Sequence, residues 1–281
     1  MFVSSTRVIV EVPPDVDGTS GVCIGGGGEP SHVVEVGVPW ATGLHQVDNP
    51  VFDAEGNLFA TYSGTRGQDA AVSVFRITPA GTREPFVTGL VNATSMAIGP
   101  DGDLYVSSRF EGAVYRVAPD GARRQIASDL GVACGIAFDS QGAMYVGDRS
   151  GTVFRVRDGE AAPFVTLPPS MAAFHLAMSP EDELFVSAPT LGSYDYVYRV
   201  DRDANVHSVP TALGRPQGLA FSPDGVLHVA DALAGAGGLY RFARLDAEPE
   251  LVVAAPAIIG VAFGPAGQLA VASNDTVYRF E

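Results

Sequence analysis

Two arginines end equivalent segments of the chain, and their spacing is the first sign of possible chemistry. Arg109 ends the segment YVSSR, and Arg149 ends the segment YVGDR 40 residues further on. A guanidinium group binds a carboxylate or a phosphate through two parallel hydrogen bonds, so two converging arginines would clamp an anionic group. Asp148 directly precedes Arg149, and a solvated ion pair between these neighbours is the alternative interpretation.

His175 and Asp148 are the candidates for acid–base catalysis. A histidine at the mouth of a site can act as a general base or as a ligand, whereas a histidine within a strand is more often a hydrogen-bonded core residue. The sequence contains no GxSxG, HExxH, P-loop or EF-hand pattern that would identify a nucleophile or a metal loop. Catalysis therefore depends on where the fold places these two residues.

The elements that position these residues come from an internal repeat. Six segments align on one apolar anchor each, and successive anchors lie 40 to 46 residues apart: Phe52, Ile98, Phe138, Met178, Phe221 and Phe263. This spacing is typical of one propeller blade, and each unit contains four short candidate strands separated by Gly, Asp and Pro turns. We predict an all-β fold, a six-bladed β-propeller of four-stranded blades.

The last blade needs a strand from the other end of the chain. The sixth unit stops after its third strand at Glu281, and the segment WATGL before Asp48 matches the segment FVTGL before Thr94. We therefore predict that Val36–Leu44 pairs with Thr276–Phe280 and closes the ring. A closed ring leaves no exposed sheet edge.

The repeated core, best seen as AFSPDGVLHVAD in Ala220–Asp231, resembles NHL-repeat propellers and, more distantly, the SMP-30/gluconolactonase-like group. The second resemblance implies a divalent metal held by acidic and amide side chains four residues before the anchors, and Asp48 matches such a ligand. The other positions of this ring are Thr94, Cys134, Phe174, Gln217 and Ile259. A hard cation needs several oxygen ligands with charge among them, but Phe174 and Ile259 offer none and Cys134 is a poor ligand for such a cation. We expect no resident cofactor, with Ca²⁺ or another divalent metal in the central channel as the alternative.

The first 28 residues differ from the repeat. The stretch from Ser4 to Ile24 resembles the last two strands of an IPT/TIG immunoglobulin-like domain, and Gly25–Gly28 is typical of a flexible linker. We assign residues 1–28 to a remnant of such a domain plus the linker, and residues 29–281 to the propeller. The start of the chain shows no signal peptide, so the cellular address stays open, and the resemblance points to an exported or envelope-associated parent.

One face of the propeller gathers the candidate ligand-binding residues, because the inner strands begin there and the second strands end there. Tyr194 belongs to one of the long loops that overhang this face. Its aromatic ring, with the polar groups around the channel, suits a small molecule, a carbohydrate or a peptide. The predicted ligand-binding residues are Asn49, Arg109, Arg149, Tyr194, Gln217 and Asp231.

Composition excludes several classes of partner. The formal net charge of −15 would repel a nucleic acid backbone, and no apolar run approaches the ~20 residues of a membrane-spanning helix. The two cysteines, Cys23 and Cys134, have no CxxC spacing, which excludes a disulfide framework and a structural zinc site. We expect a monomer that binds neither nucleic acid nor the membrane interior.

The sequence favours an NHL-type propeller that acts as a ligand- or protein-binding scaffold, as part of a larger bacterial surface or secreted protein. The alternative is a metal-dependent lactone or ester hydrolase of the SMP-30/gluconolactonase-like group, with Asp48 as metal ligand and His175 or Asp148 as the base. A lyase or cyclase that uses His175 is a third hypothesis.

Overall fold

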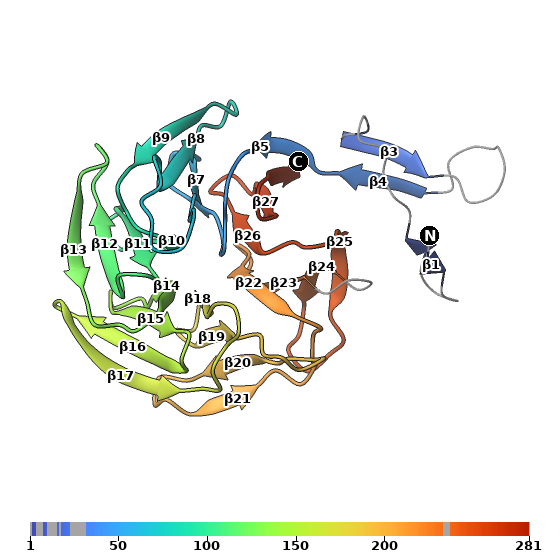
Figure 1. The fold of residues 1–281 in the computed structure, drawn as a ribbon. Coiled ribbons are helices and arrows are strands. Elements are labelled where there is room, and N and C mark those ends of the chain that lie inside the picture. The colour runs from blue at the N-terminus through green and yellow to red at the C-terminus, as the bar shows by residue number, and fades with distance from the viewer. Residues whose placement is uncertain are drawn as a thin grey trace.

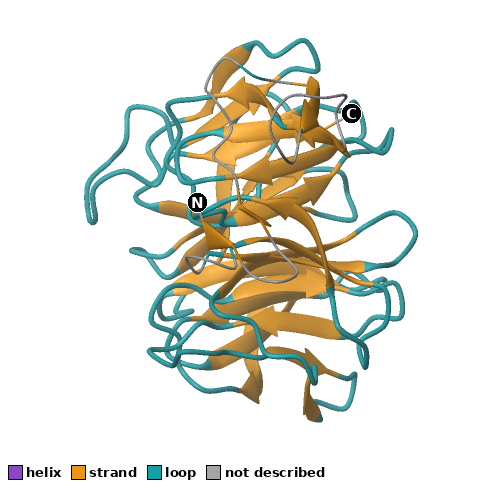
Figure 2. Ribbon diagram, turned by 90° about the vertical axis from the view of Figure 1, so that its right-hand side faces the viewer, coloured by secondary structure: helices purple, strands orange, loops and turns teal. Residues whose placement is uncertain are grey.

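The computed structural model describes residues 2–3, 8–9, 16, 18–22, 32–232 and 237–280. Every regular element in these residues is a β-strand, as Figures 1 and 2 show, which confirms the all-β prediction. Among the described residues there is accordingly no helix that could cross a membrane.

Six four-stranded antiparallel sheets surround a central axis and form the blades of a propeller (Figure 1). In blades 1 to 5 the strands follow chain order from the innermost to the outermost. Blades 1 to 3 consist of β6 (Val51–Phe52), β7 (Leu58–Thr61), β8 (Val74–Ile77) and β9 (Arg83–Val87); β10 (Ala93–Ile98), β11 (Leu104–Ser108), β12 (Ala113–Val117) and β13 (Arg123–Ala127); β14 (Ala133–Phe138), β15 (Met144–Asp148), β16 (Thr152–Arg157) and β17 (Glu160–Thr166).

The remaining three blades repeat the pattern, and the sixth takes its outer strand from the N-terminal side. Blades 4 to 6 consist of β18 (His175–Met178), β19 (Leu184–Ser187), β20 (Val197–Val200) and β21 (Val206–Ser208); β22 (Pro216–Phe221), β23 (Leu227–Asp231), β24 (Gly238–Phe242) and β25 (Glu250–Ala254); β26 (Gly260–Phe263), β27 (Leu269–Ala272), β28 (Val277–Phe280) and β5 (Val38–Ala41).

The predicted ring closure is confirmed. Strand β5 pairs antiparallel with β28, with Ala41 opposite Val277 and Val38 opposite Arg279. The strand that forms is shorter than the predicted Val36–Leu44, because Val36 belongs to β4 (His32–Val36), which pairs with β3 (Gly18–Val22). Leu44 continues the closure after β5, since its N–H donates to the carbonyl of Asp275 at 3.0 Å.

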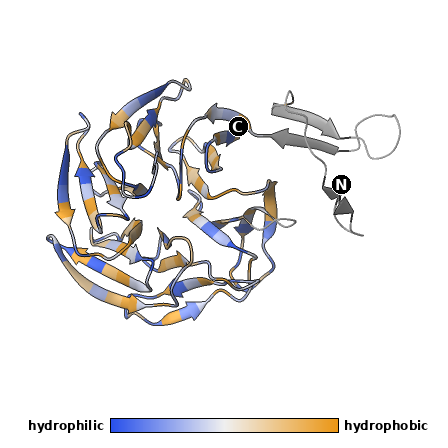
Figure 3. Cartoon of the chain, in the orientation of Figure 1, coloured by the Kyte–Doolittle hydropathy of each residue, from blue (hydrophilic) through white to orange (hydrophobic). Residues whose placement is uncertain are grey.

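The core lies between neighbouring blades rather than at one centre. Figure 3 shows apolar residues alternating along the strands, and each apolar cluster joins two adjacent blades. Val87 of blade 1, for example, packs in one cluster with Leu104 and Val106 of blade 2, and all three are at most 3 % exposed. Full burial of one such side chain contributes roughly 1.5–3 kcal/mol to folding, so blade stacking is a main source of stability.

A left-handed residue ends the first hairpin of each blade. Five blades place glycine there, with φ between 78° and 84°, as at Gly102 and Gly225, and blade 4 uses Asp182 with φ 59°. Glycine adopts this conformation without a steric cost, and Asp tolerates it. The turn chemistry thus explains why the repeat carries a DG-like signature.

The N-terminal region holds β1 (Phe2–Val3), β2 (Val8–Ile9) and β3 as short strands. Strand β1 pairs with β2, and β3 pairs with β4. Residues 4–7, 10–15, 17 and 23–31 lie outside the described residues, so the IPT/TIG remnant and the domain boundary at residue 28 stay predictions.

Candidate functional site

The channel contains one buried acid–histidine pair at its axis. Asp48 stands just before β6 of blade 1 and His175 begins β18 of blade 4, so the pair joins opposite blades of the six-membered ring. The Nδ1 atom of His175 lies 2.6 Å from Oδ1 of Asp48, and the two residues are 0 % and 3 % exposed. Sequence analysis placed both residues near the channel but did not predict their contact.

The contact with Asp48 fixes which nitrogen of the His175 imidazole carries the proton. A carboxylate only accepts hydrogen bonds, so Nδ1 of His175 carries the proton of this contact. Asp48 Oδ1 also accepts the backbone N–H of Asn49 at 2.7 Å. The Nε2 atom of His175 is buried and has no hydrogen-bond partner among the described residues. A histidine held in this way has one nitrogen fixed by the protein and one available for chemistry.

Cys134 lies beside this pair but is not a reactive thiol. Burial, the largest cause, together with the nearby charge of Asp48, raises the pKa of Cys134 to about 11, although a backbone hydrogen bond from Phe174 acts in the opposite direction. Its Sγ donates to the carbonyl of Val132 at 3.2 Å. The thiol is therefore neutral at physiological pH and unsuited to act as a nucleophile.

Arg109 is half-buried, and its charge interacts with Cys134 and with two other arginines. Burial lowers the pKa of Arg109, and the charges of Arg149 and Arg66 lower it further, while Cys134 acts in the opposite direction. The charges of Arg109 and Arg149 also lower the pKa of Cys134, and ligand binding by these two arginines stays a prediction. The charge of Arg109, after burial, lowers the pKa of His45 as well.

Asp148 and Asp231 are both buried and hold backbone loops. Oδ1 of Asp148 accepts the N–H of Val132 at 2.9 Å, and Asp231 accepts the N–H groups of Gly214 and Arg215 at 2.9 and 2.7 Å. The two acids occupy equivalent places at the ends of β15 and β23. The catalytic role of Asp148 and the ligand role of Asp231 stay predictions, and these bonds give both residues a structural role.

The other predicted ligand-binding residues fall into two groups. The amide of Asn49 is used by the fold: it donates to the carbonyl of Leu219 at 2.8 Å and accepts the N–H of Val261 at 2.9 Å, which joins blades 5 and 6 to blade 1. Gln217 is buried beside the channel, and Tyr194 is 70 % exposed on its loop. Ligand binding by these three side chains stays a prediction.

The residues present do not fit a hard divalent cation. In the described part of the chain no group of three or more His, Cys, Asp and Glu side chains has the geometry of a metal site. Asp48 is the only carboxylate of its ring, its Oδ1 is already bonded to His175 and Asn49, and Phe174 and Cys134 supply no hard oxygen ligand. Thr94 and Gln217 carry the other side-chain oxygens of this ring, both without charge, and the role of Asp48 as a metal ligand stays a prediction.

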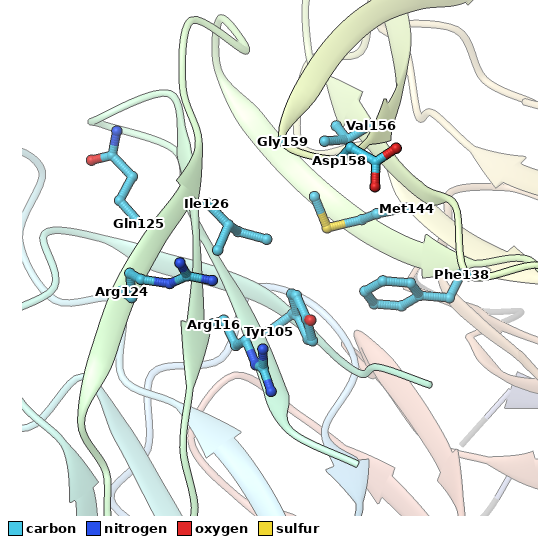
Figure 4. A pocket seen from close by; sticks show the side chains of 11 residues that line it. Tyr105, Arg116, Arg124, Gln125, Ile126, Phe138, Met144, Val156, Asp158 and Gly159 are labelled. Atoms are coloured by element: carbon cyan, nitrogen blue, oxygen red, sulfur yellow. The ribbon is translucent and has the colours of Figure 1, made fainter. Parts of the chain in front are cut away.

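A groove of about 500 Å³ lies away from the channel, between blades 2 and 3 (Figure 4). Tyr105, Phe138 and Met144 line it, with Arg116 and Asp158 at its edges. A smaller groove of about 160 Å³ occupies the equivalent place between blades 4 and 5. Because the hollow recurs between equivalent strands, we attribute it to blade packing.

Comparisons with known proteins extend the picture at the level of fold. No family profile matches the chain, and no curated protein matches it. Among solved structures, a gluconolactonase from Xanthomonas campestris is similar with a TM-score of 0.68 and 14 % identity, over 86 % of this chain and 87 % of that one. The virginiamycin B lyase from Staphylococcus aureus is similar with a TM-score of 0.61 and 17 % identity, over 83 % of this chain and 79 % of that one. The propeller fold is thus shared with both, and the NHL and IPT/TIG resemblances stay predictions.

Sequence analysis missed three residues of this region: His45, Arg66 and Asn92. His45 precedes the first blade and Arg66 lies in the loop between β7 and β8, so neither falls at a repeated position. Asn92 could have been noticed in the sequence, because Asn is one of the few residues other than Gly that adopt the left-handed conformation. Its φ in the structure is 52°.

Proposed function

We propose that this chain is a ligand-binding propeller that takes a small molecule over the mouth of its central channel. The carrying observation is Arg109, which is half-buried at the end of β11 and on which the charges of Arg66 and Arg149 act. Among the described residues, none of Arg66, Arg109 and Arg149 forms an ion pair. Acidic residues outnumber basic ones in this chain, whose net charge is −15, yet these three arginines have no acidic partner in the part of it that the structure describes. Their positive charges are therefore available to bind an anionic group of a ligand.

The surroundings of the channel support this proposal. The loop after β19 brings the exposed rings of Tyr194 and Tyr196 to the same face, and binding residues often lie on loops of this kind. The inner strands of neighbouring blades are hydrogen-bonded to one another beside the channel, since the N–H groups of Gly135 and Gly218 donate to the carbonyls of Phe174 and Ile259 at 2.7 and 2.9 Å. Because the Asp48–His175 pair joins opposite blades across the channel, we expect a ligand to rest over the channel rather than pass through it.

The test is a thermal-shift screen with carboxylates, phosphates, neutral sugars and short peptides, followed by crystal structures of the complexes. The expected result is ligand density over the channel mouth. Density only in the groove between blades 2 and 3, or no stabilisation by any compound, would contradict the proposal.

An enzyme is the second candidate, and the geometry of His175 favours it. A carboxylate fixes Nδ1 while Nε2 has no partner among the described residues, which is the arrangement of a general base or acid. Both similar structures named above are described as enzymes, a lactonase and a lyase. The complete burial of His175 ranks this candidate second, because a substrate must reach Nε2.

The enzyme candidate is tested with lactones, esters and cyclic depsipeptides, each with and without millimolar Ca²⁺ or Mg²⁺. Turnover that is lost in His175→Gln and retained in Arg124→Ala, an exposed arginine of the outer strand β13, would establish it. If no substrate is turned over, the enzyme candidate fails and only the ligand-binding proposal remains.

A further inference from the structure

Asn92 links the loop that carries Arg66 to Arg109, which follows strand β11. It is fully buried and lies just before β10, the inner strand of blade 2. Its side-chain amide donates to the carbonyls of Ser63 and Thr65 at 2.6 and 3.0 Å, and its oxygen accepts the N–H of Gly67 at 2.7 Å. These three bonds hold the main chain before and after Arg66, so they fasten the blade 1 loop to blade 2.

The main chain of Asn92 completes the link. Its carbonyl accepts the N–H of Arg109 at 3.3 Å, so a single residue connects the loop of Arg66 with the end of β11. The ring of Phe110, the residue after Arg109, lies close to Gly67 of the same loop. Arg149 stands at the equivalent end of β15, where its N–H donates to the carbonyl of Val132 at 3.2 Å.

We propose that Arg66, Arg109 and Arg149 form one binding site for a ligand with two or more negative charges, a polycarboxylate or a phosphate ester, and that Asn92 positions Arg66 in it. This inference rests on the proposed function and names its ligand class. The charges of Arg66 and Arg149 oppose that of Arg109, and an oxyanion bound among them would remove this repulsion while accepting their hydrogen bonds. A neutral sugar offers no such gain.

The burial of Arg109 strengthens this assignment. A half-buried guanidinium has lost part of its hydration, and no carboxylate replaces it among the described residues. Elsewhere the fold pairs half-buried arginines with acids, as in Arg116 with Asp101 and Asp103 at 3.0 and 2.6 Å. The missing negative charge at the channel mouth is what a ligand would supply.

The experiment measures the affinity of the full chain for citrate and for inorganic phosphate by isothermal titration calorimetry, with glucose as the neutral probe. We expect binding of at least one anion, no heat from glucose, and an affinity that falls as salt rises. Arg66→Ala, Arg109→Ala and Arg149→Ala should each weaken binding about 10-fold or more, and Arg124→Ala should leave it unchanged. The site is supported if Arg124→Ala binds the anion as tightly as the parent chain and the other three variants bind it more weakly.

The positioning role of Asn92 has its own readout. Asn92→Ala should weaken anion binding as much as Arg66→Ala, and the double variant should bind no worse than either single variant, because the two act through one contact. Independent, additive losses would overturn the positioning role. If Asn92→Ala does not fold, the arginine variants still test the site.

The failures of the two proposals are distinguishable. If the thermal-shift screen finds a neutral sugar or peptide over the channel mouth and neither anion binds, the ligand class is wrong and the ligand-binding function stands. If the anions bind but the three arginine variants bind them as well as the parent chain, the site is wrong. If no compound binds, both proposals fail.

Discussion

The two ends of each blade use charge in different ways. At the hairpin turns, where inner strands end, the charges are paired locally: Arg116 meets Asp101 and Asp103, and Arg202 meets Asp182. At the channel mouth, where inner strands begin, three arginines have no ion pair among the described residues, and the single acid–histidine pair is buried. The first arrangement recurs from blade to blade, and the second occurs only once.

This difference separates folding from function. A charge pair that recurs in several blades serves what all blades share, which is stacking. The Asp48–His175 pair and the loop that carries Arg66 have no equivalent in the described residues of the other blades, so the repeated fold alone does not account for them. Function in a propeller is therefore best sought where the repeat fails, and the following predictions test that division.

The largest effect is expected at the buried pair of the axis. Asp48→Ala leaves the Nδ1–H of His175 and the backbone N–H of Asn49 without their acceptor. Since each buried polar group left unsatisfied costs about 1–3 kcal/mol, the free energy of unfolding, measured by urea denaturation, should fall by about 2–5 kcal/mol. The double variant Asp48→Leu/His175→Leu should recover much of this loss, because replacing both partners by apolar residues is often neutral. Asp103→Ala, at a turn, is the matched control and should cost much less. Equal losses at the two ends would remove the distinction between them.

The next effect concerns the loss of stability at alkaline pH that comes from the buried thiol of Cys134. Because its pKa is raised in the folded state to about 11, Cys134 contributes stability that is fully present below the pKa of the unfolded chain, near 9. That stability is lost as the pH rises from about 9 to 11, at roughly 1.4 kcal/mol per pH unit. Unfolding of the parent chain and of Cys134→Ala, compared from pH 7 to pH 11, should show a steeper alkaline loss in the parent. Parallel curves would show that the thiol is not buried as described.

A smaller effect is expected at the acids that end the second strands. Asp148→Asn keeps an acceptor for Val132 but loses the charge that also holds the N–H and hydroxyl of Ser150, so stability should fall by about 1–3 kcal/mol. Asp231→Asn, its equivalent in blade 5, should behave in the same way. If instead Asp148→Asn is stable but abolishes a measured activity, the catalytic prediction for Asp148 gains over its structural role.

Repetition also decided what the sequence could predict. The blades, their order and the closing strand were predictable, because the anchors and the WATGL and FVTGL segments recur at fixed spacing. Arg109 and Arg149 were found for the same reason. The contact between Asp48 and His175 was not, since it joins residues 127 apart through the axis, and no local pattern reports which blades face each other. Arg66 depends on three hydrogen bonds from Asn92, and these follow from tertiary structure alone.

The smallest effect compares one arginine from each set. Arg76 pairs with Glu84 at 2.7 Å, both partly exposed, so Arg76→Gln should lower stability by about 0.2–1 kcal/mol at low salt and by less at high salt. Arg109→Gln should leave stability unchanged or raise it slightly, because it removes a partly desolvated charge that Arg149 and Arg66 repel. Thermal melting at two salt concentrations measures both. The test is whether the two substitutions change stability in opposite directions. If Arg109→Gln lowers stability as Arg76→Gln does, the fold, rather than a ligand, requires Arg109.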